Sequence, residues 1–218
     1  MWKPEPITLT WPIDHDGACL EKLPLRPVTK AEYDKHVLPL KDGTQQFVVM
    51  ATLATGLPEK VIKTLKRPDF NSLAEWLRKM SGKNADEFRT ISAEEFLKIT
   101  DPEWPEYNDP NDYRQINDHE YLEITDPDAP KLLVPITSDD GGLIYQVTLE
   151  VPGLEATILM EKKPDLEDQN WFINMHCTGL SRAELGRLSL PDWNQIQARI
   201  TRFLADTGDY FRGVTSTR

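Results

Sequence analysis

Thr55-Gly56-Leu57 and Pro68-Asp69-Phe70-Asn71 return 123 residues later as Thr178-Gly179-Leu180 and Pro191-Asp192-Trp193-Asn194. Over residues 55–80 and 178–203, seven of 26 aligned positions are identical and no gap is needed. Most of the other apolar positions exchange one apolar residue for another. Similarity at a fixed spacing predicts a duplicated module, and duplication more often doubles a binding surface than a catalytic centre.

The repeat divides the chain into four segments. We expect a first module at residues 1–83, an acidic connector at 84–129, a second module at 130–206 and a frayed tail at 207–218. Each module is small enough to need its partner or the connector for full stability. The predicted fold class is α+β, with a β-hairpin followed by three to four helices, present twice and joined by the proline-rich connector.

In module one, apolar and polar residues alternate over 7–13, which predicts a half-buried strand. A turn at 14–17 and apolar residues over 20–25 complete a hairpin. Thr29 and Glu32 form a capping box that starts a short helix. A buried helix over 45–54 is expected to end at Gly56, the next helix to begin at Pro58, and the last to be capped by Asp69.

Module two repeats this order. Apolar residues at 133 and 136, a turn over 139–142 and alternation over 143–151 predict the second hairpin. A buried helix is expected over 171–177, and the later helices are expected to be capped by Ser181 and Asp192. The repeat core is predicted to consist of Leu57, Leu65, Phe70, Leu180, Leu188 and Trp193.

The net charge of −11 resides in the connector. Residues 84–129 contain 14 Asp or Glu against three Lys or Arg, and the rest of the chain carries 22 residues of each sign. Because binding to phosphates requires a basic surface, this distribution argues against a nucleic-acid partner.

Neither a membrane span nor a signal peptide is expected. The longest apolar run, residues 48–54, is the length of a core segment, and the charged, proline-containing start does not resemble a secretory signal. Two unpatterned cysteines, Cys19 and Cys177, indicate a reducing cytoplasm.

Two short segments contain residue types that could form a chemical site. Asp14-His15-Asp16 could ligate a metal, but His15 has no spaced second ligand and the segment lies where a hairpin needs its turn. His176-Cys177 could be a nucleophile pair, but adjacent residues of a helix point in different directions. The repeat has Leu53 and Ala54 at those positions. We therefore predict no catalytic residue, no metal and no cofactor.

Three aromatic residues are candidates for a protein interface. Trp76 lies about 90° from the apolar stripe of the last helix in module one, and its repeat position is Arg199. Packing against the connector is an equally good explanation for Trp76. The connector contributes Trp104 and Tyr107, which make it too aromatic for a plain solvated linker.

Module one resembles a known family. The order of residues 7–13, Asp16-Gly17, residues 23–27, Thr55-Gly56-Leu57, Leu65 and Asp69-Phe70 is similar to the tail assembly chaperones of Mu-like contractile-tailed bacteriophages. The resemblance covers about residues 7–80, with a diverged second copy at about 131–204. Family members typically have one module, so the second copy and the acidic connector are departures.

The resemblance implies a non-enzymatic protein of the bacterial host cytoplasm that binds the phage tape-measure protein, the tail-tube protein or both. Two linked modules suit such a role, because binding by one module raises the effective concentration of the other. A structural tail or baseplate component that stays in the virion is the alternative, and an enzyme of unrecognised type is a weaker one. The sequence also leaves self-association open.

Overall fold

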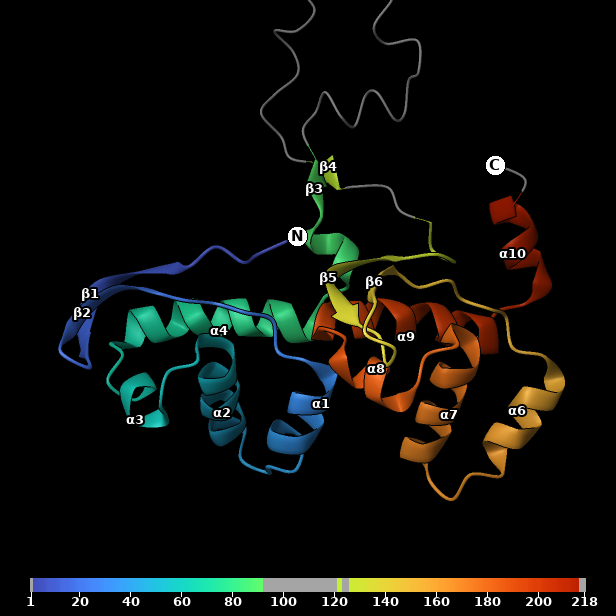
Figure 1. The fold of residues 1–218 in the computed structure, drawn as a ribbon, viewed down its shortest axis with the longest axis horizontal. Coiled ribbons are helices and arrows are strands. Elements are labelled where there is room, and N and C mark those ends of the chain that lie inside the picture. The colour runs from blue at the N-terminus through green and yellow to red at the C-terminus, as the bar shows by residue number, and fades with distance from the viewer. Residues whose placement is uncertain (1, 92–120, 123–125, 216–218) are drawn as a thin grey trace, which may run out of the picture.

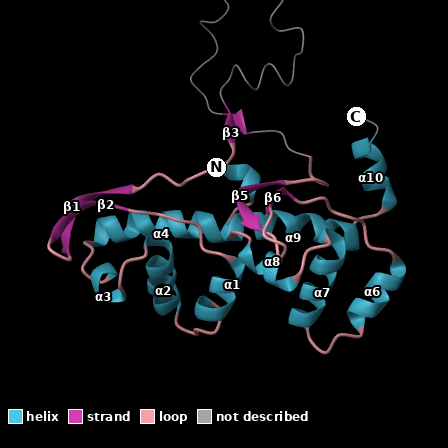
Figure 2. Ribbon diagram, in the orientation of Figure 1, coloured by secondary structure: helices cyan, strands magenta, loops and turns pink. Residues whose placement is uncertain are grey.

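The computed structural model describes residues 2–91, 121–122 and 126–215 (Figure 1). The fold is mixed α+β, with small two-stranded antiparallel sheets and a larger number of helices (Figure 2). Long helices form one layer, shorter helices project from one side of it, and the hairpins lie on the other side.

Module one begins with a hairpin and continues with helices of very different lengths. Asp16 and Gly17 both have positive φ, which is the conformation that a tight hairpin turn between twisted strands requires. The capping box of Thr29 and Glu32 is confirmed at the start of the first helix. The elements are β1 (Ile7–His15), β2 (Ala18–Leu23), α1 (Lys30–Glu32), the π-helical continuation η1 (Tyr33–Val37), α2 (Gly43–Thr55), α3 (Glu59–Ile62) and α4 (Arg67–Gly82).

Module two has the corresponding elements in the same order: β5 (Lys131–Thr137), β6 (Leu143–Gln146), α6 (Leu154–Glu161), α7 (Leu166–Thr178), α8 (Arg182–Arg187) and α9 (Leu190–Ala205). Within the part of the connector that the structure describes lie η2 (Ala85–Phe88), β3 (Thr90–Ile91) and β4 (Tyr121–Leu122). The expected frayed tail contains α10 (Gly208–Thr215).

Two pairs of helices, one helix of each pair in each module, have the same bounds once the 123-residue spacing is applied. Helices α2 and α7 each have 13 residues and end at a left-handed glycine, Gly56 with φ 71° and Gly179 with φ 68°. Helices α4 and α9 each have 16 residues with proline in the first turn. A local hydrogen bond recurs as well. The side-chain oxygen of Thr55 accepts the N–H of Leu57, and that of Thr178 accepts the N–H of Leu180.

The prediction that Asp69 and Asp192 cap the last helix of each module is wrong. Helix α4 is capped at Lys66 and α9 at Ser189, three residues before Asp69 and Asp192. Both aspartates are buried and accept backbone N–H groups from the first strand of their own module. Asp69 accepts those of Thr10 and Trp11, at 3.0 and 3.1 Å, and Asp192 accepts those of Leu133 and Val134, at 2.7 and 3.4 Å.

Two other boundaries differ from expectation. Pro58 is the N-cap of α3, one residue before its first turn. Strand β6 ends at Gln146, although alternation continues to residue 151. Backbone hydrogen bonds continue beyond it in the register of the Lys131–Gln146 pair, since Val147 N–H donates to Pro130 and Leu149 N–H donates to Asp128.

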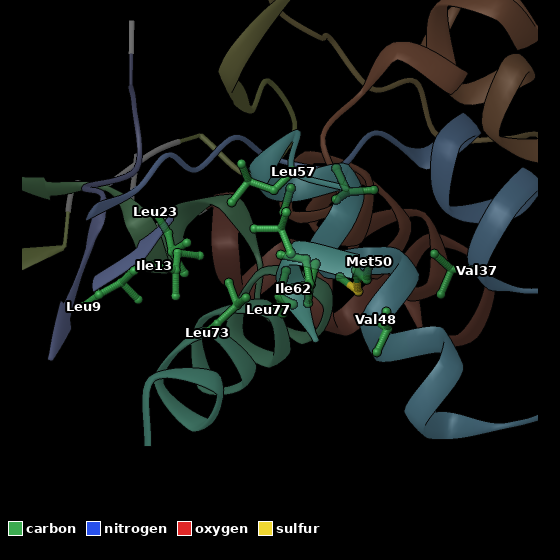
Figure 3. Close-up of a cluster of buried hydrophobic side chains, with 14 of the residues drawn as sticks. Leu9, Ile13, Leu23, Val37, Val48, Met50, Leu57, Ile62, Leu73 and Leu77 are labelled. Carbon is green, nitrogen blue, oxygen red and sulfur yellow. The ribbon is translucent and has the colours of Figure 1, made fainter. Parts of the chain in front are cut away.

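Each module has its own hydrophobic core. The core of module one gathers β1, β2, α2, α3 and α4 (Figure 3), and it also includes Leu190 from α9. The core of module two is built around Ile173, Leu185, Leu188, Ile196 and Ile200, which are almost completely buried. Helix α9 of module two thus contributes Leu190 to the core of module one.

The modules meet head to tail. In Figure 1 the projecting helices follow one another as α3, α2, α1 and then α8, α7, α6, so that α1 of module one packs on α8 of module two. An antiparallel bridge joins Thr29 and Ser189, because Lys30 N–H donates to Leu188 and Leu190 N–H donates to Val28. Asn194 Nδ2, near the start of α9, donates to carbonyl groups at the end of α4.

Candidate interaction surfaces

The most apolar exposed surface of the described residues lies around α6. We call it the α6 surface, and its large side chains are Val151, Leu154, Ile158, Leu159 and Leu166. Leu154 and Leu166 are 78% and 76% exposed. Leu154 and Ile158 are four residues apart, so they lie on one side of the helix, while Ala156 faces the module and is buried.

This concentration of apolar side chains makes the α6 surface a candidate interaction site. Single exposed leucines are ordinary, but contiguous apolar patches on soluble domains mark contacts with other proteins. This surface was not predicted from the sequence, because the alternation over 143–151 predicts a strand and the apolar residues after it were not assigned to an outer helix face. The run Leu154, Ile158 and Leu159 was the available signal.

A second surface is formed by the hairpins. Trp11 on β1 and Leu143 and Tyr145 on β6 are exposed, and we refer to them as the hairpin surface. Each hairpin is a two-stranded sheet that contributes side chains to the core of its module, while these three side chains remain exposed.

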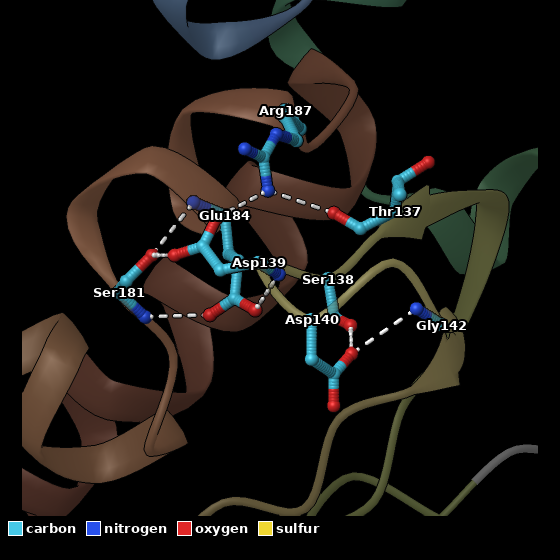
Figure 4. Close-up of polar contacts among 8 residues, drawn as sticks. All are labelled: Thr137, Ser138, Asp139, Asp140, Gly142, Ser181, Glu184 and Arg187. Carbon is cyan, nitrogen blue, oxygen red and sulfur yellow. Dashed lines mark hydrogen bonds and ion pairs between the residues drawn. The ribbon is translucent and has the colours of Figure 1, made fainter.

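A polar network fixes the tip of the second hairpin on α8 (Figure 4). Asp139 accepts the hydroxyl of Ser181 at 2.6 Å and Nη1 of Arg187 at 2.8 Å, and its own N–H donates to Glu184 at 2.9 Å. The hydrogen bond from Ser181, followed by that from Arg187, holds the pKa of Asp139 below its usual value. The network orients the strand that carries Leu143 and Tyr145.

Trp76 is partly buried and packs against the core of module one. Its repeat position, Arg199, is only 7% exposed and is bonded to Asp128, with Nε 2.7 Å from the carboxylate. The charged residue at the repeat position is therefore also a buried packing residue. Trp76 keeps part of its surface available for a partner. Trp104 and Tyr107 lie outside the described residues.

The six residues predicted to form the repeat core differ in how deeply they are buried. Leu57, Leu188 and Trp193 are buried, whereas Leu65, Phe70 and Leu180 are partly buried and pack against their cores or a neighbouring ring. The Trp193 ring is tilted against that of Trp171, with the ring centres 5.3 Å apart, and the Lys30 ammonium lies 4.7 Å from the Trp193 ring centre. In module one the Phe70 ring is likewise tilted against that of Phe47, with the centres 5.7 Å apart, and the Arg67 guanidinium lies 5.4 Å from the Phe70 ring centre.

The contacts and burial of the histidines and of Cys177 in the two candidate chemical segments do not form a reactive site. His15 lies 3.6 Å from the neighbouring Asp16 carboxylate at the hairpin turn. His176 is exposed while Cys177 is fully buried, and burial raises the pKa of the Cys177 thiol to about 11. The thiol is therefore protonated at neutral pH and a poor nucleophile. No three His, Cys, Asp or Glu side chains of the described residues are grouped closely enough to hold a metal ion.

Across residues 2–91, 121–122 and 126–215, no helix has the length and apolar character to cross a membrane. Residues 129–205 match the family described as phage tail assembly chaperone proteins, E, or 41 or 14. The match covers module two, whereas the sequence resemblance was drawn on module one. It supports a role in phage tail assembly and suggests a protein without enzymatic activity. Neither curated proteins nor solved structures give a significant match.

Proposed function

We propose that this protein is a non-enzymatic tail assembly chaperone of a Mu-like phage, acting in the host cytoplasm on the tape-measure protein, the tail-tube protein or both. The match of residues 129–205 to the chaperone family carries this proposal. The matched region spans the complete second module, from the start of its hairpin to the end of α9.

The proposal includes duplication of the module. Its support is the common 123-residue spacing of helix bounds, left-handed glycines and buried aspartates. Two modules would present two hairpins along one side of the molecule. A long helical partner could then touch both, and the second contact would form at high effective concentration.

Co-expression with the tail proteins of its own phage tests the function. A tagged copy of the full chain is expected to capture the tape-measure protein, the tail-tube protein or both. Tyr145→Ser, on the exposed hairpin surface, should weaken capture without changing the thermal midpoint. Trp76→Arg tests the partly buried ring, and a lower midpoint would assign Trp76 to packing. Failure of the unmodified chain to capture either tail protein would contradict the proposal.

A structural tail or baseplate component is the alternative, because such a protein would share the same family and surfaces. Mass spectrometry of purified virions separates the two roles. A chaperone is expected to be absent from the finished particle although it is present in infected cells. Detection in stoichiometric amount in the virion would favour the structural role.

A further inference from the structure

Helix α4 has a basic outer face that its repeat, α9, lacks. Residues 59–83 contain seven Lys or Arg against three Asp or Glu, whereas the equivalent residues 182–206 contain four against three. Only one of the seven basic positions, Lys79, has a basic counterpart in module two, which is Arg202. The two helices have the same length and equivalent bounds, so the fold of the module does not require these charges.

Basic side chains in the second half of α4 line a groove, which we call the α4 groove. Its volume is about 610 Å³, and it is lined by six residues on one side of α4, from Asn71 to Gly82, and by Lys83. Gly82 leaves the groove open, because a Cβ added there would meet no atom within 4 Å. The lining holds three basic residues and one acidic residue, so the groove is positively charged.

The same groove recurs in module two without the positive charge. Its volume there is about 530 Å³, and its lining residues are those found 123 positions after the residues of the α4 groove. The charged ones are Arg202 and Asp206, one of each sign. The groove is thus a feature of the module, whereas its positive charge belongs to module one alone and needs an explanation other than folding.

The charge at the α4 groove is available to a partner. Lys79 and Lys83 form exposed ion pairs with Glu75 and Glu87, with N–O distances of 3.2 and 2.6 Å, and such pairs contribute little in water. Arg78 is exposed, and no acidic side chain within the described ranges pairs with its guanidinium. A guanidinium can bind a carboxylate through two parallel hydrogen bonds, so a carboxylate is the ligand that matches it best.

We propose that the α4 groove binds an acidic α-helix of the tail protein that this chain captures, an inference that rests on the proposed function. Rows of side chains on one helix pack into the grooves of another, and the small residues Ala74 and Gly82 permit a close approach. Gly82 follows Arg78 by four residues and Lys79 by three, so it lies between these two basic side chains on the helix surface. A helix seated at Gly82 therefore meets positive charge on both sides.

A nucleic acid fits this surface less well than a protein helix. Glu75 lies in the groove, and the net charge of −11 opposes the approach of a polyanion. A protein helix can place carboxylates on Arg78 and Lys83 and an uncharged side chain near Glu75. It can also contact Trp76, which is partly exposed and lies one turn before Lys79 at the edge of the groove.

Quantitative capture of the co-expressed tail proteins tests the charge of the groove. Arg78→Glu should lower the affinity about tenfold, because it places like charges at the contact. Arg78→Lys keeps the charge and should retain most of the capture. Lys35→Glu is the matched control, because it makes the same charge change at an exposed residue of η1, outside the groove, and should leave capture unchanged. Capture that nuclease treatment abolishes would overturn the inference, since the ligand would then be a nucleic acid.

Gly82→Leu tests the shape of the groove. It fills the groove without a clash and favours the helix, so the variant should fold, as circular dichroism can check, and should capture less tail protein. Ala205→Leu is the matched control, because it adds leucine at the equivalent exposed position of α9, beside the uncharged groove, and should leave capture unchanged.

Two kinds of failure are distinguishable in this experiment. Normal capture by Arg78→Glu or by Gly82→Leu, or an equal loss of capture in either control, would overturn the inference and leave the proposed function intact. Failure of the unmodified chain to capture any tail protein would contradict the proposed function and this inference with it.

Discussion

Asp192 ties the start of α9 to strand β5 through three hydrogen bonds, from the N–H groups of Leu133 and Val134 and from the hydroxyl of Ser189. These bonds favour the carboxylate, but removal from water is the larger effect and raises the pKa of Asp192 to about 6. The folded protein therefore retains a proton here at pH values where the unfolded chain has lost it.

Stability should consequently fall as the pH rises through this window. The contribution of Asp192 is fully present below about pH 4 and is lost as the pH passes about 6, with a total of about 3 kcal/mol. Urea unfolding at a series of pH values measures it. Asp192→Asn has no proton to lose and should flatten this part of the profile. An unchanged slope in the variant would assign the pH dependence to other groups.

The placement of these aspartates shows where residue patterns mislead. An aspartate before an apolar stripe is typical of an N-cap, and the sequence analysis assigned Asp69 and Asp192 accordingly. The helices begin earlier because proline is favoured in the first turn, which moves each aspartate into the third helical position. There it faces a strand 59 residues away in sequence, a contact that no local pattern contains.

At the scale of elements, α4 and α9 share bounds but differ in how deeply one aromatic ring is buried. Trp193 is 9% exposed, beneath Lys30 and against Trp171, whereas Phe70, which lies beneath Arg67 and against Phe47, is only partly buried. Trp193→Ala should therefore destabilise by about 3–5 kcal/mol and Phe70→Ala by about 2 kcal/mol or less. Denaturant melts of the two variants measure the difference, and equal losses would contradict it.

Helix ends with local signals were predictable, and elements fixed by distant contacts were not. The capping box at Thr29 and the left-handed glycine after α2 are encoded within a few residues. The exposed face of α6 depends on which face of module two receives no neighbour among the described residues. The candidate surface was therefore found only once the modules were seen together.

At the scale of the whole molecule, the junction between the modules predicts that they unfold together. Leu190 of α9 belongs to the core of module one, and Gly186 lets α8 approach α1 closely. We therefore expect a single calorimetric unfolding transition, because the core of module one includes a residue of module two and α8 packs closely on α1.

Substitution at Gly186 tests this coupling in two steps. Gly186→Ala adds one methyl group that requires a shift of a few tenths of an ångström, so the single transition should persist. Gly186→Leu gains similar helix propensity but cannot fit against Ala31, so it should separate the modules and split the transition into two. The comparison isolates packing at the junction from helix formation. Two transitions in the unmodified protein, or one in Gly186→Leu, would show that the modules are coupled through other contacts or not at all.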